Sequence, residues 1–134
     1  MALFIGTLLA LASCTLGRFA GLDRDRAFYP IMMIVIASYY CLFAALDGAP
    51  EVLAADTAVA MGFVLAAVIG FRTSPWLIVA ALAAHGLMDM VHHMMIDNRG
   101  VPGWWPSFCG AFDLTAALWL GLATARRRPS AGRV

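Results

Sequence analysis

Residues 75–96 read PWLIVAALAAHGLMDMVHHMMI, an apolar run interrupted by four ionisable side chains. A helix of about 20 apolar residues spans the hydrocarbon core of a bilayer, so this run is long enough to cross it. The ionisable side chains are His85, Asp89, His92 and His93. Because ionisable groups are costly inside a membrane, they usually mark a functional site. The stretch therefore predicts a membrane-spanning helix that carries the chemistry of the protein.

The composition of the 134-residue chain agrees with this prediction. Hydrophobic residues make up 63% of the sequence and charged residues 13%, and the mean hydropathy is +0.84. Soluble domains carry about 25% charged residues, so this composition excludes a soluble globular protein. The sequence contains no phosphate-binding glycine loop, dinucleotide-binding motif or GxSxG motif. We expect no nucleic-acid partner and no soluble catalytic domain.

Five windows of the chain are apolar enough to span a membrane, each bounded by turn residues or charges. They run approximately from Ala2 to Gly17, Tyr29 to Leu46, Val52 to Phe71, Pro75 to Ile96 and Ser107 to Ala125. The first window is short unless it continues through Arg18 to Gly21, with the arginine side chain reaching the interface. We predict an all-α, polytopic bundle of five transmembrane helices, with residues 1–134 forming a single transmembrane domain.

The first window also resembles a processing signal, because Leu11-Ala12-Ser13-Cys14 matches a lipoprotein cleavage site. A signal peptide begins with a positively charged region, and Met1 to Leu11 carries no such charge. We therefore expect the first window to remain as a transmembrane helix.

The arginines set the expected orientation, since the sequence contains no lysine. In a five-span arrangement one side carries Arg18, Arg24, Arg26, Arg72, Arg126, Arg127, Arg128 and Arg133. The opposite side carries only Arg99, together with the acidic residues Asp47, Glu51, Asp56 and Asp97. Because positive loops stay on the cytoplasmic side, the N-terminus is predicted outside and the C-terminus inside.

The ionisable residues of the fourth window form one stripe on the predicted helix. At 100° per residue, His85, Asp89 and His92 fall within about 60° of one another. His85 and His92 lie about 10 Å apart along the axis, too far to share one ion on a straight helix. Residues three or four apart can share an ion, so Asp89 is the expected centre, with His85, His92 or His93 as its partner.

A second helix must complete such a site. Asp113, in the fifth window, has nearly the same predicted depth as Asp89, so the two carboxylates can face each other across the bundle. Additional candidates are Cys109 one turn from Asp113, Asp47 and Asp56 near the outer surface, and Tyr40 as a hydroxyl donor.

Nitrogen and oxygen donors together predict a divalent transition metal. They favour zinc, iron or manganese, of which zinc and iron are the leading expectations. Copper is an alternative because Met88, Met90, Met94 and Met95 surround the histidines. Two readings without a metal also stay open: an acid-base or proton site, and a structural network built on a buried ion pair.

The segment 97–106, DNRGVPGWWP, follows the fourth window and lies over the predicted site. Trp104 and Trp105 fit the interfacial aromatic belt, with stacking on a substrate as the alternative.

The motif His85-x3-Asp89-x2-His92-His93, with the Pro-Gly-Trp-Trp-Pro loop and Cys109-x3-Asp113, resembles a family of small bacterial integral-membrane proteins of unknown function. The resemblance runs from His85 to Trp119 and implies a multi-pass protein of the bacterial inner membrane. The Asp-x2-His-His part also looks like one histidine box of membrane desaturases and hydroxylases. Those enzymes use about eight histidines, whereas this chain has 3. A looser likeness, in residue types only, is to membrane ceramidase-type hydrolases.

These observations favour a membrane-embedded metalloenzyme that acts on a lipid or hydrophobic small molecule at the outer leaflet. A hydrolase or an oxidoreductase would fit, with Asp89 and Asp113 as ligands or general base and His85 as a deep ligand or proton relay. One alternative is a metal-ion or proton transporter or sensor. Another is an accessory subunit of a larger membrane complex, with the histidines either binding haem or packing. Gly62, Ala66 and Gly70 form a small-residue face that could support a homo-oligomer.

Overall fold

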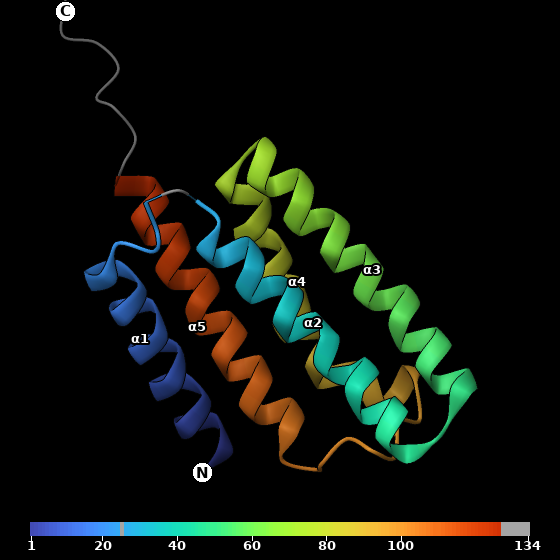
Figure 1. Cartoon of the computed structure of the whole chain (residues 1–134). Coiled ribbons are helices and arrows are strands. Elements are labelled where there is room, and N and C mark those ends of the chain that lie inside the picture. The colour runs from blue at the N-terminus through green and yellow to red at the C-terminus, as the bar shows by residue number, and fades with distance from the viewer. Residues whose placement is uncertain (25, 127–134) are drawn as a thin grey trace, which may run out of the picture.

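The computed structural model describes residues 1–24 and 26–126, which form five helices and no strand. The helices are α1 (Ala2–Ala20), α2 (Phe28–Asp47), α3 (Pro50–Arg72), α4 (Pro75–Met95) and α5 (Trp105–Arg126) (Figure 1). Each is long and apolar enough to cross a membrane. The predicted all-α class and the five spans are confirmed, and the architecture is that of a multi-pass membrane protein.

Local sequence signals explain where the helices begin and end. Both α1 and α2 stop at a glycine in the left-handed conformation, Gly21 with a φ of 75° and Gly48 with a φ of 71°. Such a backbone angle favours glycine because it has no Cβ. A proline in the first turn opens α3 and α4, where its missing N–H costs no hydrogen bond. The first span continues to Ala20, as its length required.

The helices pack in the order α1, α5, α4, α3, α2, and α2 also touches α4. Figure 1 shows the start of α1, the α2–α3 turn and the α4–α5 loop at one end of the bundle. The ends of α1, α3 and α5 lie at the other end, and each of their last turns carries an arginine. Of the charged residues used to predict orientation, Arg127, Arg128 and Arg133 lie outside the described residues.

The surface of the bundle is apolar and part of its interior is polar. Exposed residues include Leu16, Phe19 and Leu118, with 67%, 87% and 64% of their surface accessible. The largest fully buried side chains include three aspartates and a histidine beside Met33 and Leu82. Apolar side chains facing outward suit a lipid environment, whereas buried acids need partners inside the protein.

Two glycines allow α4 and α5 to approach closely. A Cβ added at Gly86 would lie 3.0 Å from the carbonyl oxygen of Gly110 and 3.1 Å from the Cβ of Asp113. A Cβ at Gly110 would lie 3.0 Å from the carbonyl oxygen of Gly86. Small residues at a crossing let two membrane helices pack backbone to backbone. This crossing brings Asp89 and Asp113 to the same place in the bundle.

The small-residue face expected on α3, formed by Gly62, Ala66 and Gly70, is packed differently at its two ends. Gly70 packs against Ile78 of α4, where any added Cβ would overlap that side chain. A Cβ at Gly62 would meet no atom within 4 Å. Within the described part of the chain, only the Gly70 end of this face is therefore used for close packing.

Replacement of Gly86 by leucine is expected to destabilise the bundle, because the side chain must enter the α4–α5 crossing. Overpacking of this kind costs about 1–3 kcal/mol of unfolding free energy, and contact with backbone puts this case at the upper end. Thermal melting of the detergent-solubilised protein, followed by circular dichroism, measures the loss. The matched control is Gly62→Leu, which has open space and should melt at or above the wild-type temperature. Equal melting temperatures for the two variants would contradict the crossing described here.

Candidate metal centre

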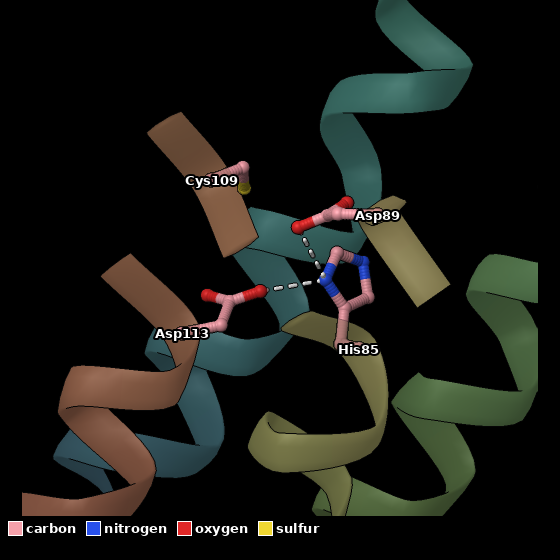
Figure 2. A group of neighbouring side chains, drawn as sticks. All are labelled: His85, Asp89, Cys109 and Asp113. Carbon is pink, nitrogen blue, oxygen red and sulfur yellow. Dashed lines mark hydrogen bonds and ion pairs between the residues drawn. The ribbon is translucent and has the colours of Figure 1, made fainter. Parts of the chain in front are cut away.

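Helices α4 and α5 together place four potential metal ligands side by side. His85 and Asp89 lie one turn apart on α4, and Cys109 and Asp113 lie one turn apart on α5. The Nδ1 of His85 is 2.7 Å from the Oδ2 of Asp113 and 3.8 Å from the Oδ2 of Asp89. Figure 2 shows the imidazole between the two carboxyl groups, with the Cys109 sulfur beside them.

The four donor atoms lie within 4.8 Å of one another. The side chains are buried: Asp89 and Asp113 are 0% exposed, His85 is 1% and Cys109 is 3%. Measured along the helices, His85 lies about 15 Å from the end of α4 and Cys109 about 6 Å from the start of α5. The site thus lies inside the membrane-spanning part of the bundle, in the half nearer the α4–α5 loop.

Two carboxylate oxygens in this group have no hydrogen-bond partner in the part of the chain described. They are the Oδ2 of Asp89 and the Oδ1 of Asp113, and both are fully buried. A buried polar atom without a partner is rare in native proteins, and its desolvation costs about 1–3 kcal/mol. Both oxygens belong to the same cluster, so one bound cation could satisfy them together.

The balance of charge also favours a cation. With both carboxylates ionised and His85 protonated, the group carries an excess negative charge in a low-dielectric interior. A divalent metal ion cancels the charge of the two carboxylates when the imidazole is neutral, and with Cys109 bound as a thiolate one negative charge is left. Because an uncompensated charge is costly within a membrane, the residues present fit a divalent ion.

The donor set is compatible with zinc or iron, although the side chains must shift slightly to bind either. Two ligands of a tetrahedral zinc ion lie about 3.3 Å apart when their bonds are about 2.0–2.1 Å long. The 2.7 Å contact between His85 and Asp113 is shorter, and it is a hydrogen bond. Metal binding would therefore replace this hydrogen bond, open the pair by about half an ångström and release a proton.

Tyr40 of α2 holds Asp89 from a third helix. Its hydroxyl donates a 2.7 Å hydrogen bond to the Oδ1 of Asp89. Its ring stacks on the imidazole of His92, with ring centroids 3.9 Å apart. Phe63 of α3 packs its ring against His85 at a centroid distance of 4.7 Å. These contacts fix the orientation of both α4 side chains that face α5.

A second buried pair lies nearer the end of the bundle. The Nε2 of His92 is 2.7 Å from the Oδ1 of Asp56 on α3. The Nδ2 of Asn98 donates to the other oxygen of Asp56 at 2.7 Å and to the Tyr40 carbonyl at 3.0 Å. Its Oδ1 accepts from the backbone N–H of Gly100 at 3.1 Å. This network fastens the α4–α5 loop to α2 and α3.

Asn98 is a residue that the sequence argument missed. Its only sequence signal is its position two residues before Gly100 in a turn, where asparagine side chains commonly accept a backbone hydrogen bond. Nothing in the pattern indicates that its amide also bridges two helices.

The structure separates several residues that the sequence grouped together. His85, Asp89, Cys109 and Asp113 form one group. His92 and Asp56 form the second pair, and the space between His92 and His85 is too small for a water molecule. Of the partners expected for Asp89, the structure brings His85 together with it and pairs His92 with Asp56 instead.

His93 and Asp47 are exposed and lie outside both groups. Adjacent residues of a helix project about 100° apart, and only His92 of the two histidines faces α2 and α3. Asp47 is the last residue of α2, about 10 Å along the helix from Tyr40, so it lies beyond the depth of the site.

Comparison of the chain with family models, curated proteins and solved structures finds no match.

Removal of the Tyr40 hydroxyl is expected to destabilise the protein, because the Oδ1 of Asp89 would lose the hydrogen bond that Tyr40 donates to it. In Tyr40→Phe we expect the free energy of unfolding to fall by about 1–3 kcal/mol. Denaturation in mixed detergent measures it. Tyr39→Phe is the control, since the Tyr39 hydroxyl makes no hydrogen bond within the described residues, and it should change stability by less than about 0.5 kcal/mol. Equal free energies of unfolding for Tyr40→Phe and Tyr39→Phe would show that Tyr40 does not support Asp89.

Proposed function

We propose that the protein is a membrane-embedded metalloprotein that binds a divalent transition metal through His85, Asp89, Cys109 and Asp113. The observation that carries this proposal is the meeting of four buried donor side chains at one helix crossing. Two unpartnered carboxylate oxygens in the same group add to it. Zinc and iron suit the nitrogen, oxygen and sulfur donors best, and copper is the third candidate.

We further propose a metal-dependent enzyme that acts on a lipid or another hydrophobic small molecule. A bound metal ion would supply a Lewis acid or an activated water for hydrolysis, or a redox centre for oxidation. Asp89 and Asp113 would act as metal ligands or general base, and His85 as a ligand or proton relay. The hydrogen bond from Tyr40 keeps Asp89 in place. The site is buried within the membrane-spanning part of the bundle, which supports a substrate that arrives through the lipid phase.

The site lies in the half of the bundle that carries the α4–α5 loop, and we place this half in the outer leaflet. Arg18, Arg72 and Arg126 lie in last helical turns at the opposite end, which supports a cytoplasmic location for that end. In a bacterial cell the protein would be a multi-pass protein of the inner membrane.

Proton transfer or sensing is a second candidate function. A series of buried polar groups runs from Asp113 through His85, Asp89, Tyr40 and His92 to Asp56 and ends at the loop, although Tyr40 and His92 are joined by ring stacking and not by a hydrogen bond. From Trp76 to Ala84, α4 carries apolar side chains and continues no such chain toward the other end. This one-sided arrangement favours proton exchange with one aqueous face over transport across the membrane.

Metal analysis of protein purified without a nickel column tests the proposal. We expect near-stoichiometric zinc or iron in the wild type by inductively coupled plasma mass spectrometry. His85→Ala and Asp113→Asn should each remove most of it, because each deletes a donor from a four-donor site.

His93→Ala is the matched control, since it removes an exposed histidine of the same helix and should retain the metal. Retention of metal in all three variants would place the ion elsewhere. Failure of wild-type protein to bind added zinc or iron would refute the metalloprotein.

A further inference from the structure

A lengthwise apolar cavity of about 540 Å³ lies between α1, α2 and α5. It exists because α2 packs mainly on α3 and α1 mainly on α5, so that α2 meets α1 and α5 through single side chains, such as Phe28 at Gly17 and Tyr39 at Trp105. Its walls include Leu9 and Ser13 of α1, Ile31 and Val35 of α2, and Phe112 of α5. Ile31 and Val35 are 58% and 47% exposed, so the cavity opens sideways toward lipid.

The cavity reaches the candidate metal centre at one residue. Cys109 belongs to the lining of the cavity and to the group of four donors. In Figure 2 its sulfur points toward the carboxyl groups. A molecule in the cavity would therefore lie against the α5 wall of the site without first crossing an aqueous phase.

Trp105 supplies a hydrogen-bond donor at the same end. It lines the cavity, and its Nε1 is buried without a hydrogen-bond partner among the described residues. Tyr39 and Phe43 pack edge-on against its ring at centroid distances of 5.0 and 4.8 Å, which hold it in position. Buried indole N–H groups usually find an acceptor. Because the Nε1 of Trp105 is closed off in the described arrangement, the ring must turn for a ligand oxygen in the cavity to reach it.

The length and the lining of the cavity together define its occupant. Along α2 it extends from Phe28 to Tyr39, about 16 Å at 1.5 Å per residue. This length is close to the thickness of one leaflet, which is half of a hydrocarbon core about 30 Å thick. Because Phe28 begins α2, the cavity extends past the middle of the bundle toward the arginine-bearing end. The lining contains no charged residue, and Ser13, Tyr39, Trp105 and Cys109 are its polar side chains.

We propose that this cavity binds one acyl chain of a membrane lipid, with the lipid's first polar oxygen at Trp105 and Cys109. The chain runs from there toward Phe28. If the metal centre is catalytic, as proposed above, the substrate is a lipid presented at the bond next to its acyl chain. Binding of the chain itself depends on the cavity and not on the metal.

Photo-crosslinking tests the proposal with the full chain in phosphatidylcholine vesicles that contain a phospholipid with a diazirine in mid-chain. Mass spectrometry should locate label on cavity residues of α1, α2 and α5 in preference to the outer surface. Val35→Trp fills the cavity and should reduce cavity labelling to the level of the outer surface. Val68→Trp, a change at a valine that is 42% exposed on α3 outside the cavity, should leave the labelling unchanged.

Trp105→Phe keeps the aromatic packing and removes the N–H. It should reduce labelling about fivefold, which corresponds to the loss of a single hydrogen bond. Metal content is measured in the same samples and should stay at the wild-type level in all three variants.

Label spread evenly around the bundle and insensitive to Val35→Trp would overturn the proposal, since the cavity would then hold lipid like any outer surface. Crosslinks between two chains through the cavity would also overturn it, because a second copy would be the occupant. Selective labelling without bound metal would support the acyl-chain site and refute only the metalloprotein. Bound metal without selective labelling would do the reverse.

Discussion

The close crossing of α4 and α5 is the constraint on which the rest of the structure depends. Gly86 and Gly110 remove the two Cβ atoms that would hold the backbones apart. Because hydrocarbon tails are as apolar as the helix surfaces, packing and polar contacts must hold membrane helices together. The crossing allows backbone contact, and it also brings two aspartates, a histidine and a cysteine from two helices into one small volume.

That arrangement would be unstable without compensation, and the surrounding contacts provide part of it. Tyr40 satisfies one oxygen of Asp89, and His85 satisfies one oxygen of Asp113. One oxygen of each carboxyl group is left without a hydrogen bond among the described residues, and both oxygens belong to the same cluster. By contrast, both oxygens of Asp56 are bound, one by His92 and the other by Asn98. The two buried groups therefore differ in kind: the one nearer the α4–α5 loop is complete without a ligand, and the deeper one is suited to hold a cation.

The sequence predicted the fold well because span length and hydropathy are local properties. All five windows became helices, and the shift of α1 to Ala20 followed from the length needed to cross a membrane. The meeting of Asp89 and Asp113 was also accessible, since equal depth can be counted in residues from each helix end. Helix order around the bundle could not be counted in this way. For that reason the sequence could not separate His92 from Asp89, or show that His93 faces outward.

The sequence could not predict the role of Asn98 or the lateral cavity, for the same reason. The role of Asn98 depends on which helices flank the loop, and the cavity exists because α2 packs mainly on α3 and meets α5 through few side chains. The hydrophobic periodicity of a single helix predicts neither of these properties. Cys109 shows the limit most directly: it was a secondary candidate by spacing, and only the assembled bundle makes it both a donor of the cluster and a wall of the cavity.

X-ray absorption at the metal edge of the purified, metal-loaded protein tests the central claim most directly. We predict a first shell of nitrogen and oxygen atoms at about 2.0–2.1 Å with a sulfur atom at about 2.3 Å. The sulfur contribution should disappear in Cys109→Ser and persist in Cys41→Ser, which changes a cysteine outside the cluster. A shell of light atoms alone in the wild type, or a sulfur contribution unaffected by Cys109→Ser, would contradict a metal centre at the α4–α5 crossing.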